Sequence, residues 1–187
     1  MKKHLLAAAA VLAFSGAASA QWYGSASAGM SRQSIDCTGA PNCDETGTAF
    51  KILGGYKYTP NIAAEVGYFS FGKATASDPT ASVDFKTTLL GVGVAFHGDF
   101  APSWTGVARL GVGRVKTKLD VGVTGLGSAS ESDTNTSLYG GVGIGYRLQS
   151  NLTIDGSLDF TKSKFNKLGL DESWNATAIS VGVTYSF

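Results

Sequence analysis

The most constraining feature of this sequence is that apolar side chains recur at every second position through almost the whole chain after residue 20. The pattern is clearest at the C-terminus, where small or polar residues alternate with Ile179, Val181, Val183, Tyr185 and Phe187. Successive side chains of a β-strand point to opposite faces, so a period of two predicts strands, whereas a helix has a period of about 3.6. We therefore expect an all-β chain.

The segments between the alternating stretches are rich in Gly, Ser, Thr, Asn, Asp and Pro, which favour turns and loops. The predicted strands cover residues 22–31, 48–58, 62–72, 82–97, 104–118, 136–148, 152–162 and 174–187. The short connections are residues 59–61, 98–103 and 149–151, and the long polar ones are residues 32–47, 73–81, 119–135 and 163–173. Short turns at one end and long loops at the other predict an eight-stranded antiparallel up-and-down transmembrane β-barrel, with the long loops outside the cell.

The N-terminus has the three parts of a secretory signal peptide. Lys2 and Lys3 form a basic region, an apolar run follows at residues 5–14, and small residues lead to a cleavage site after Ala20. The apolar run is shorter than the roughly 20 residues that a transmembrane helix needs, and no later run reaches that length. We expect a signal peptide at residues 1–20, a barrel domain at residues 21–187, and no transmembrane helix in the mature chain.

The charge of the mature chain is close to balanced. Of the 15 Lys and Arg residues, Lys2 and Lys3 fall in the signal peptide, so 13 remain against 14 Asp and Glu. No basic stripe is present, which argues against a nucleic-acid partner. Charged residues make up 16% of the chain, below the roughly 25% that is typical of soluble domains.

A soluble periplasmic ligand-binding barrel also alternates with a period of two, so alternation alone does not decide which face is inside. The polar face decides, because it consists mostly of small residues rather than of the Lys and Glu of a water-facing exterior. An example is the row Gly141, Gly143 and Gly145 opposite Val142 and Ile144. Small residues suit the narrow lumen of an eight-stranded barrel, and the apolar face then contacts lipid.

Aromatic residues support this orientation because they gather near the strand ends. One group lies near the short turns: Trp22, Tyr56, Tyr58, Trp104, Tyr146, Tyr185 and Phe187. A second group, Phe50, Phe160 and Trp174, lies nearer the long loops. Two aromatic bands separated by aliphatic residues predict the interfacial girdles of a membrane barrel.

The two cysteines, Cys37 and Cys43, lie close together in the first long loop. Two thiolates without nearby His or Cys leave a zinc site half empty, so we expect no metal site. In an oxidising compartment this spacing favours a local disulfide that closes a turn.

The opening WYGSASAG, the segment YGGVGIGYRLQSNLTIDGSLDF at residues 139–160 and the closing strand resemble the small outer-membrane β-barrels of the opacity-protein, OmpX and OmpA transmembrane-domain group. The resemblance covers essentially the whole mature chain. It implies an integral protein of the outer membrane of a Gram-negative bacterium, in contact with outer-membrane lipid and lipopolysaccharide and without a cofactor. It also implies that the last strand, with Tyr185 and Phe187, is the signal read by the barrel-assembly machinery.

This group serves adhesion and envelope integrity and includes disputed narrow pores, so the resemblance is specific for architecture rather than for function. We expect a structural or surface-interaction role, with long loops that suit host or cell-surface ligands. A narrow porin-like channel for small solutes is the alternative.

The alternation also places charged side chains in the lumen. By parity these are Lys51, Lys57, Glu65, Arg109, Arg147, Asp155 and Asp159. Buried charges must be paired, so we expect Glu65 to pair with Arg109, supported by Lys51. Such a cluster is either the gate of a small pore or a packed polar core that keeps the barrel shut; we favour the packed core because a barrel of this size is filled by side chains.

Enzymatic function is not expected. Some barrels of this size act on lipid A and need a Ser with a His that takes its proton. Only His97 remains after signal removal, next to a short turn and without a Ser two residues on, although Asp99 could orient it. A separate surface prediction concerns Lys162, Lys164 and Lys167, which could contact lipopolysaccharide phosphates through charge-assisted hydrogen bonds.

Overall fold

The computed structural model describes residues 21–34, 42–77, 81–123, 127–167 and 170–187. The predicted signal peptide lies outside these residues. The strands are β1 (Trp22–Gln33), β2 (Asn42–Asp44), β3 (Thr46–Lys57), β4 (Ile62–Ser77), β5 (Ala81–Ala101), β6 (Trp104–Val123), β7 (Gly127–Gln149), β8 (Leu152–Lys167) and β9 (Leu170–Ser186). None of the described residues forms a helix long and apolar enough to cross a membrane.

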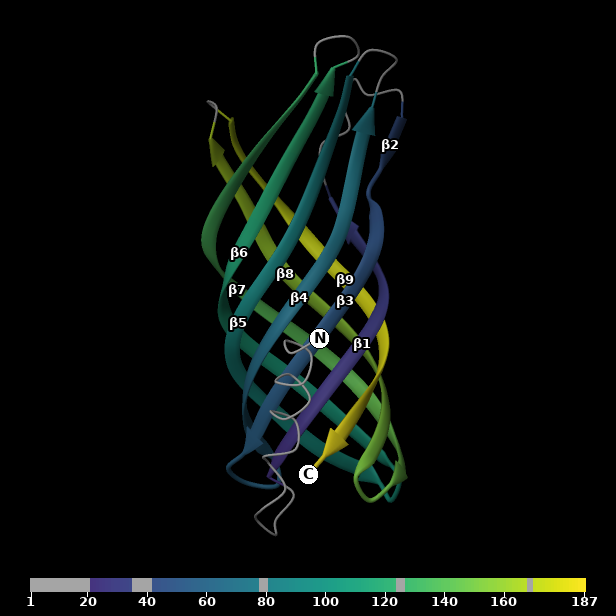
Figure 1. Cartoon of the computed structure of the whole chain (residues 1–187). Coiled ribbons are helices and arrows are strands. Elements are labelled where there is room, and N and C mark those ends of the chain that lie inside the picture. Colours follow the sequence, from purple (N-terminus) through teal and green to yellow (C-terminus); the bar gives the residue numbers. More distant parts are fainter. Residues whose placement is uncertain (1–20, 35–41, 78–80, 124–126, 168–169) are drawn as a thin grey trace, which may run out of the picture.

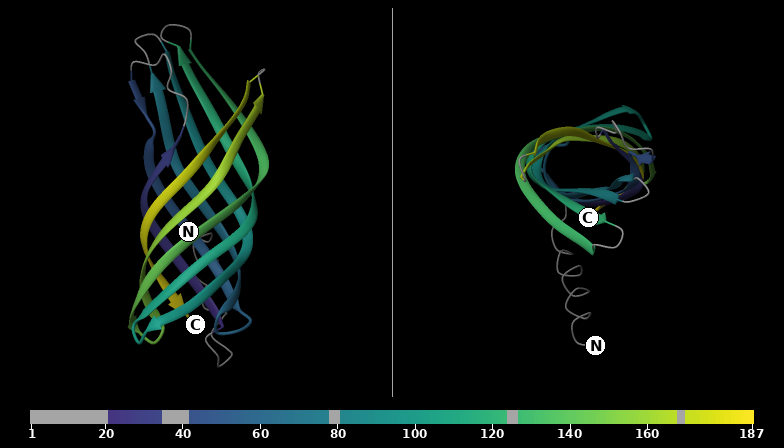
Figure 2. Two further views of the ribbon diagram at one scale, coloured as in Figure 1. Left: turned by 180° about the vertical axis from the view of Figure 1, so that it is seen from behind. Right: turned by 90° about the horizontal axis from the view of Figure 1, so that it is seen from above.

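The long strands close into one antiparallel barrel, which Figure 2 shows as a ring when seen from above. Each long strand pairs with its neighbours in the chain, and β1 also pairs with the last strand, β9. The short strand β2 pairs with the upper end of β4 and adds no wall of its own. The predicted eight-stranded antiparallel up-and-down barrel is therefore confirmed. Closure matters in lipid, where an unpaired strand edge would leave backbone groups without hydrogen bonds.

The two faces of the barrel wall differ as the alternation predicts. On the outside, Leu90 of β5 and Val181 of β9 are 60% and 66% exposed, whereas the inward-facing Leu89 and Ala176 are fully buried. The outer apolar belt is continued by Met30, Ile52, Val66, Val92, Leu110, Val112, Leu138, Val142, Ile144, Ile154, Leu158 and Ile179. A continuous exposed apolar belt of this kind marks a membrane-contacting surface.

The short turns and the C-terminus lie at one end of the barrel, at the bottom of Figure 1. At this end the exposed aromatic residues include Trp22, Tyr58, Trp104, Tyr185 and Phe187, as expected for an interfacial girdle.

The other predicted girdle is correct for Phe50 and Phe160 and wrong for Trp174. Trp174 points into the lumen, where it is 6% exposed and its ring lies 5.5 Å from that of Phe85. The reason is parity, because Trp174 shares the inward face of β9 with Ala176 and Ala178.

The predicted long loops at residues 119–135 and 163–173 are largely wrong, because the strands continue through them. Strands β6 and β7 stay paired to Val123 and Gly127, and β8 and β9 to Lys167 and Leu170. Beyond the membrane the outer face of the strands meets water, so backbone pairing continues although the outward residues are polar. The inward face still carries buried apolar residues such as Leu119. These extensions rise above the apolar belt at the top of Figure 1.

One irregularity changes which residues face outward. The β4–β5 register shifts between Ser70 and Lys73, and Gly72 has a φ of 68°. A Cβ at this glycine would lie 2.6 Å from the carbonyl oxygen of Thr48, so the bulge requires Gly here. The inserted residue reverses the parity of β4: Phe71 faces the lumen before it, and Lys73 faces outward after it.

Candidate functional site

The lumen is filled by side chains in its middle and toward the long-hairpin end. Phe71, Leu89 and Val115 are each at most 2% exposed. They belong to a cluster whose other members are Ala49, Leu53, Phe69, Tyr139, Ala176 and Ala178. We call these nine residues the apolar plug. A second cluster of Trp174 and Leu119, with Val83, Phe85 and Val121 against it, lies nearer the hairpin ends.

The apolar plug differs from the mostly small and polar inward face that the sequence predicts. The signal that could have found it is parity, since Phe69 and Phe71 share the inward face of β4 with Glu65. Aromatic residues are both lipid anchors in the girdles and members of the plug, and strand parity separates the inward-facing aromatic side chains from the outward-facing ones.

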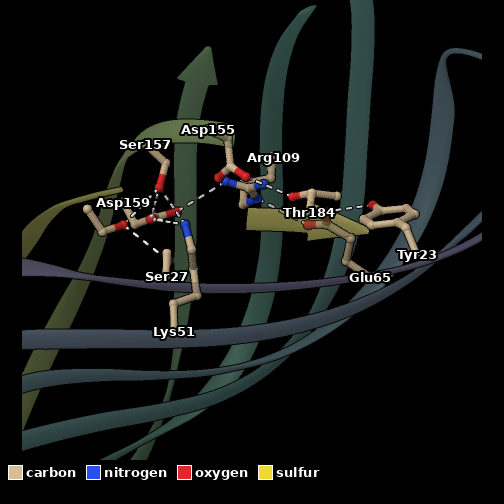
Figure 3. Close-up of polar contacts among 10 residues, drawn as sticks. Tyr23, Ser27, Lys51, Glu65, Arg109, Asp155, Ser157, Asp159 and Thr184 are labelled. Atoms are coloured by element: carbon tan, nitrogen blue, oxygen red, sulfur yellow. Dashed lines mark hydrogen bonds and ion pairs between the residues drawn. The ribbon is translucent and has the colours of Figure 1, made fainter. Parts of the chain in front are cut away.

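Next to the plug lies a cluster of four charged side chains, Lys51, Glu65, Arg109 and Asp159, which we call the charge cluster (Figure 3). Arg109 Nε donates to Glu65 Oε2 at 3.1 Å, and Arg109 Nη1 lies 3.4 Å from Asp159 Oδ1. Lys51 Nζ donates to Asp159 Oδ2 at 2.5 Å. All four side chains are at most 8% exposed. The cluster thus holds two positive and two negative charges, with Arg109 bridging the carboxylates.

Neutral side chains complete the hydrogen bonding of the charge cluster. Tyr23 Oη donates to Glu65 Oε1 at 2.7 Å, so both oxygens of this carboxylate are engaged. Lys51 Nζ also donates to Ser157 Oγ at 2.6 Å. The Ser157 Oγ is in turn hydrogen-bonded to the Ser180 Oγ at 3.0 Å. Buried ions are tolerated only when such pairing and hydrogen bonding are complete, and this network links β1, β3, β4, β6, β8 and β9 across the lumen.

Two glycines leave the space that the charge cluster needs. A Cβ at Gly55 would lie 2.2 Å from the Tyr23 ring, and one at Gly141 would lie 2.4 Å from Asp159 Oδ1. Both glycines lie on the strand next to the residue for which they make room, since Gly55 pairs with Tyr23 and Gly141 with Asp159. The Gly-rich strands therefore serve lumen packing as well as barrel curvature.

The remaining predicted lumen charges lie closer to the short turns. Asp155 accepts a hydrogen bond from Thr184 Oγ1 at 2.8 Å. Arg147 pairs with Asp99 at the rim. Lys57 Nζ lies 5.7 Å from the centre of the Tyr23 ring, within cation–π range. These residues line a cavity of about 300 Å³ at the short-turn end, whose inner wall includes Tyr23 and Arg109.

His97 lines the same cavity but lacks the partners of a catalytic base. Its Nε2 lies 3.3 Å from Tyr23 Oη, and the two rings meet edge to face. Asp99, the predicted orienting group, is instead paired with Arg147. The hydroxyl beside His97 is thus a phenol that already donates to Glu65, which is not the serine and histidine arrangement of acyl transfer. Among the described residues, no group of three or more His, Cys, Asp or Glu side chains could hold a metal ion.

The other predicted site residues lie apart from the lumen. Lys162 is exposed on the outer face of β8, whereas the side chains of Lys164 and Lys167 lie outside the described part of the structure. Cys37 also lies outside it, so the disulfide to Cys43 stays a prediction. Phe187 is 51% exposed, and its backbone N–H donates to the carbonyl oxygen of Trp22 at 2.9 Å.

Comparison with known proteins gives a family and a set of similar folds. A family model described as outer membrane protein beta-barrel domain matches residues 6–187. Among solved structures, neisserial surface protein A (NspA) is similar with a TM-score of 0.63 and 20% identity, over 92% of this chain and 100% of that chain. None of the curated proteins compared with the chain matches it.

Two further structures share the fold. The attachment invasion locus protein Ail of Yersinia pestis has a TM-score of 0.55 and 20% identity, over 89% of this chain and 99% of that chain. The outer membrane protein OprG of Pseudomonas aeruginosa has a TM-score of 0.50 and 13% identity, over 89% and 96% of the two chains. At these identities the similarity concerns the fold alone.

Proposed function

Because the chain belongs to the outer membrane protein beta-barrel domain family, whose place is the outer membrane of Gram-negative bacteria, we propose that it acts in surface interaction rather than as a pore or an enzyme. In this proposal the closed barrel is an anchor in the membrane. The strand extensions at the long-hairpin end are the binding elements, and they face the outside of the cell.

The observation that carries the proposal is the continuation of paired strands beyond the lipid-facing belt. On β5 the last strongly apolar outward residue is Leu90, and pairing with β6 continues to Ala81 and Val123. Over this stretch the outward residues are polar or charged, among them Lys86 and Arg114. A chain that only closed a barrel in lipid would gain nothing from ordered strands in water.

The filled lumen supports a role that needs no transport. The apolar plug and the charge cluster both lie between the short-turn cavity and the long-hairpin end. An eight-stranded barrel is only just wide enough to be filled by side chains. In the alternative, a narrow channel, the cavity at the short-turn end is part of the conducting path and the charge cluster is its gate.

One protein with a similar fold carries an attachment role in its name. The Yersinia pestis protein Ail is an attachment invasion locus protein, and one of its structures contains the heparin analogue sucrose octasulfate. By analogy, the partner of the present chain is a host or cell-surface molecule that contacts the hairpin ends. Lipopolysaccharide contact through Lys162, Lys164 and Lys167, and recognition of Tyr185 and Phe187 by the assembly machinery, belong to the same proposal.

The test compares the whole protein with a variant whose β6–β7 extension is cut back. Residues 119–131, which lie between the paired Lys118 and Ser132, are replaced by an Asn-Gly turn. Cells that display either protein are assayed for binding to cultured host cells and to sulfated glycans, and refolded protein is assayed for conductance. We expect binding by the whole protein, loss of binding by the variant, and no sustained current from either. Sustained current without binding would replace the proposal by the channel alternative.

The absence of enzymatic activity has its own test. Lipid A from cells with and without the protein is compared by mass spectrometry, and we expect the same acyl pattern in both. A changed acyl pattern that depends on His97 would overturn this part of the proposal.

A further inference from the structure

A patch of basic side chains covers the outer face of three neighbouring strands just beyond the apolar belt. We call it the β4–β6 patch, and its members are Lys73, Lys86, Arg114, Lys116 and Lys118. All are exposed on the outside of the barrel wall. The alternation in the sequence does not reveal this patch, because it shows neither the bulge at Gly72 nor the strand extensions that bring these residues together.

The register places three of these lysines in one row across the sheet. Lys73 of β4 pairs with Lys86 of β5, and Lys86 pairs with Lys118 of β6. Neighbouring strands lie about 4.8 Å apart, so the three Cα atoms span only about 10 Å. Like charges directly opposite each other destabilise a strand pair unless something offsets them.

Acidic side chains offset this charge only in part. Asp84 pairs with Lys73 at 3.0 Å, and Asp120 pairs with Lys118 at 2.8 Å. Lys86 lies between these two pairs. No acidic side chain in the described residues forms an ion pair with Lys86, Arg114 or Lys116. The patch therefore keeps an excess of positive charge that can accept an external anion.

The depth of the patch indicates where this anion lies. Arg114 is directly opposite Leu90 in the β5–β6 register, and Leu90 is one of the most exposed apolar residues of the belt. The next outward residue below Arg114 is Val112, which is also lipid-facing. The guanidinium group thus starts at the level where lipid tails end and headgroups begin.

We propose that the β4–β6 patch binds the phosphate groups of lipopolysaccharide in the outer leaflet. The inference rests on the orientation in the proposed function, with the long hairpins outside the cell. A membrane-embedded phosphorylated amphiphile fits better than a soluble polyanion, because Arg114 and Lys116 lie at the headgroup level and not at the hairpin ends. Phosphate accepts charge-assisted hydrogen bonds from both Arg and Lys.

The patch differs from the lysine cluster predicted from the sequence. Lys162, Lys164 and Lys167 lie on β8, which is separated from β6 by β7. The two sets allow a matched comparison, because three basic residues can be replaced by Gln in each. The patch variant is Lys86→Gln, Arg114→Gln, Lys116→Gln, and the control variant is Lys162→Gln, Lys164→Gln, Lys167→Gln.

Each protein is expressed in the outer membrane, extracted in mild detergent and analysed by mass spectrometry for lipopolysaccharide bound per folded barrel. We expect the patch variant to retain at least about fivefold less lipopolysaccharide than the wild type, the effect of a single basic residue at an anionic membrane surface. The control variant, whose lysines are proposed as further contacts, should retain more than the patch variant. Equal retention by wild-type and patch variant, or a loss confined to the control variant, would overturn the inference. If the patch variant does not fold, Arg114→Gln alone is compared with Lys162→Gln.

A titration of refolded protein separates the sources of the anion. Purified lipopolysaccharide, the same lipid after removal of its phosphates, and soluble heparin are added at low and high salt. We expect the phosphorylated lipid to bind more tightly than the other two, and salt to weaken it. Heparin binding that equals lipopolysaccharide binding and is lost in the patch variant would assign the patch to a soluble polyanion and reject the inference. The proposed function fails separately, if host-cell binding is absent while lipopolysaccharide retention still depends on the patch.

Discussion

Lys51 Nζ lies 2.5 Å from Asp159 Oδ2, and the two side chains are 5% and 3% exposed. The pair joins β3 to β8, two strands that are not neighbours in the barrel wall. The ion pair therefore spans the lumen. Arg109 contacts the same carboxylate from β6. Asp159 therefore pairs with both cations of the charge cluster, and it is the ion-pair partner of Lys51.

Asp159→Asn should destabilise the barrel by about 3–5 kcal/mol, because it leaves Lys51 buried without a counter-ion and Arg109 with Glu65 alone. Lys51→Met should cost less, since Asp159 keeps Arg109 and Ser157 as partners. Urea unfolding of protein refolded in lipid vesicles measures both. The matched control is Asp120→Asn, which removes an exposed pair with Lys118 and should cost at most about 1 kcal/mol. Equal costs at positions 120 and 159 would contradict this account.

Gly29→Ala should prevent closure of the barrel between β1 and β9. A Cβ at this position would lie 2.0 Å from the carbonyl oxygen of Ile179 and 2.6 Å from the Cα of Ser180, both of them backbone atoms. Gly24 lies on the same strand and pairs with the same neighbour, but a Cβ there would meet nothing closer than 3.9 Å. We expect Gly24→Ala to fold like the wild type and Gly29→Ala to give little heat-modifiable protein on a gel. Similar yields of the two variants would show that the wall adapts at Gly29.

Deleting Phe187 should impair assembly in cells more than stability after folding. The residue contributes one backbone hydrogen bond to Trp22 and an exposed ring 5.1 Å from that of Tyr185, so its loss removes little from the folded barrel. Phe187→Ala keeps the backbone bond and removes only the side chain, and Phe187→Trp keeps an aromatic ring. We expect membrane yield to fall for the deletion and for Ala but not for Trp, with unfolding midpoints close to wild type. Equal membrane yield for all forms would reduce Phe187 to an interface anchor.

Glu65→Ala should leave the barrel closed to ions, because the apolar plug and not the charge cluster is expected to block the lumen. Planar-bilayer recordings of refolded wild type and variant, with a porin as positive control, make the comparison. We expect no sustained current from either. A variant that conducts while the wild type does not would show that Glu65 belongs to a gate.

The sequence predicts strand parity well and long-range partners poorly. Parity is a local property, so the alternation alone was enough to expect Lys51 and Arg109 on the inner face. The choice of Asp159 as the partner of Lys51 depends on the stagger of strands around the whole barrel, which no local pattern contains. We predicted Lys51 as support for Glu65 and Arg109, whereas in the structure it contacts Asp159 directly.

Local exceptions explain the remaining differences. The bulge at Gly72 reverses parity within β4, so an uninterrupted count would place Lys73 in the lumen rather than on the outside. In the extension beyond residue 118, β6 keeps alternating apolar residues at Leu119 and Val121, but residues 127–137 of β7 are almost all small or polar and show no apolar alternation. In a sequence, a glycine and a polar strand in water both resemble loop residues. Only backbone pairing with the neighbouring strands shows that they belong to the barrel wall.

The continued pairing of β6 and β7 up to Val123 and Gly127 has a consequence for immune recognition. Residues of the two strands that lie side by side there, such as Lys116 and Thr134, are 18 positions apart in the chain. An antibody that binds this surface therefore recognises a discontinuous epitope, which is lost when the protein is denatured. Sera raised against the intact outer membrane should bind these hairpins on cells and fail to bind the same residues on a boiled blot.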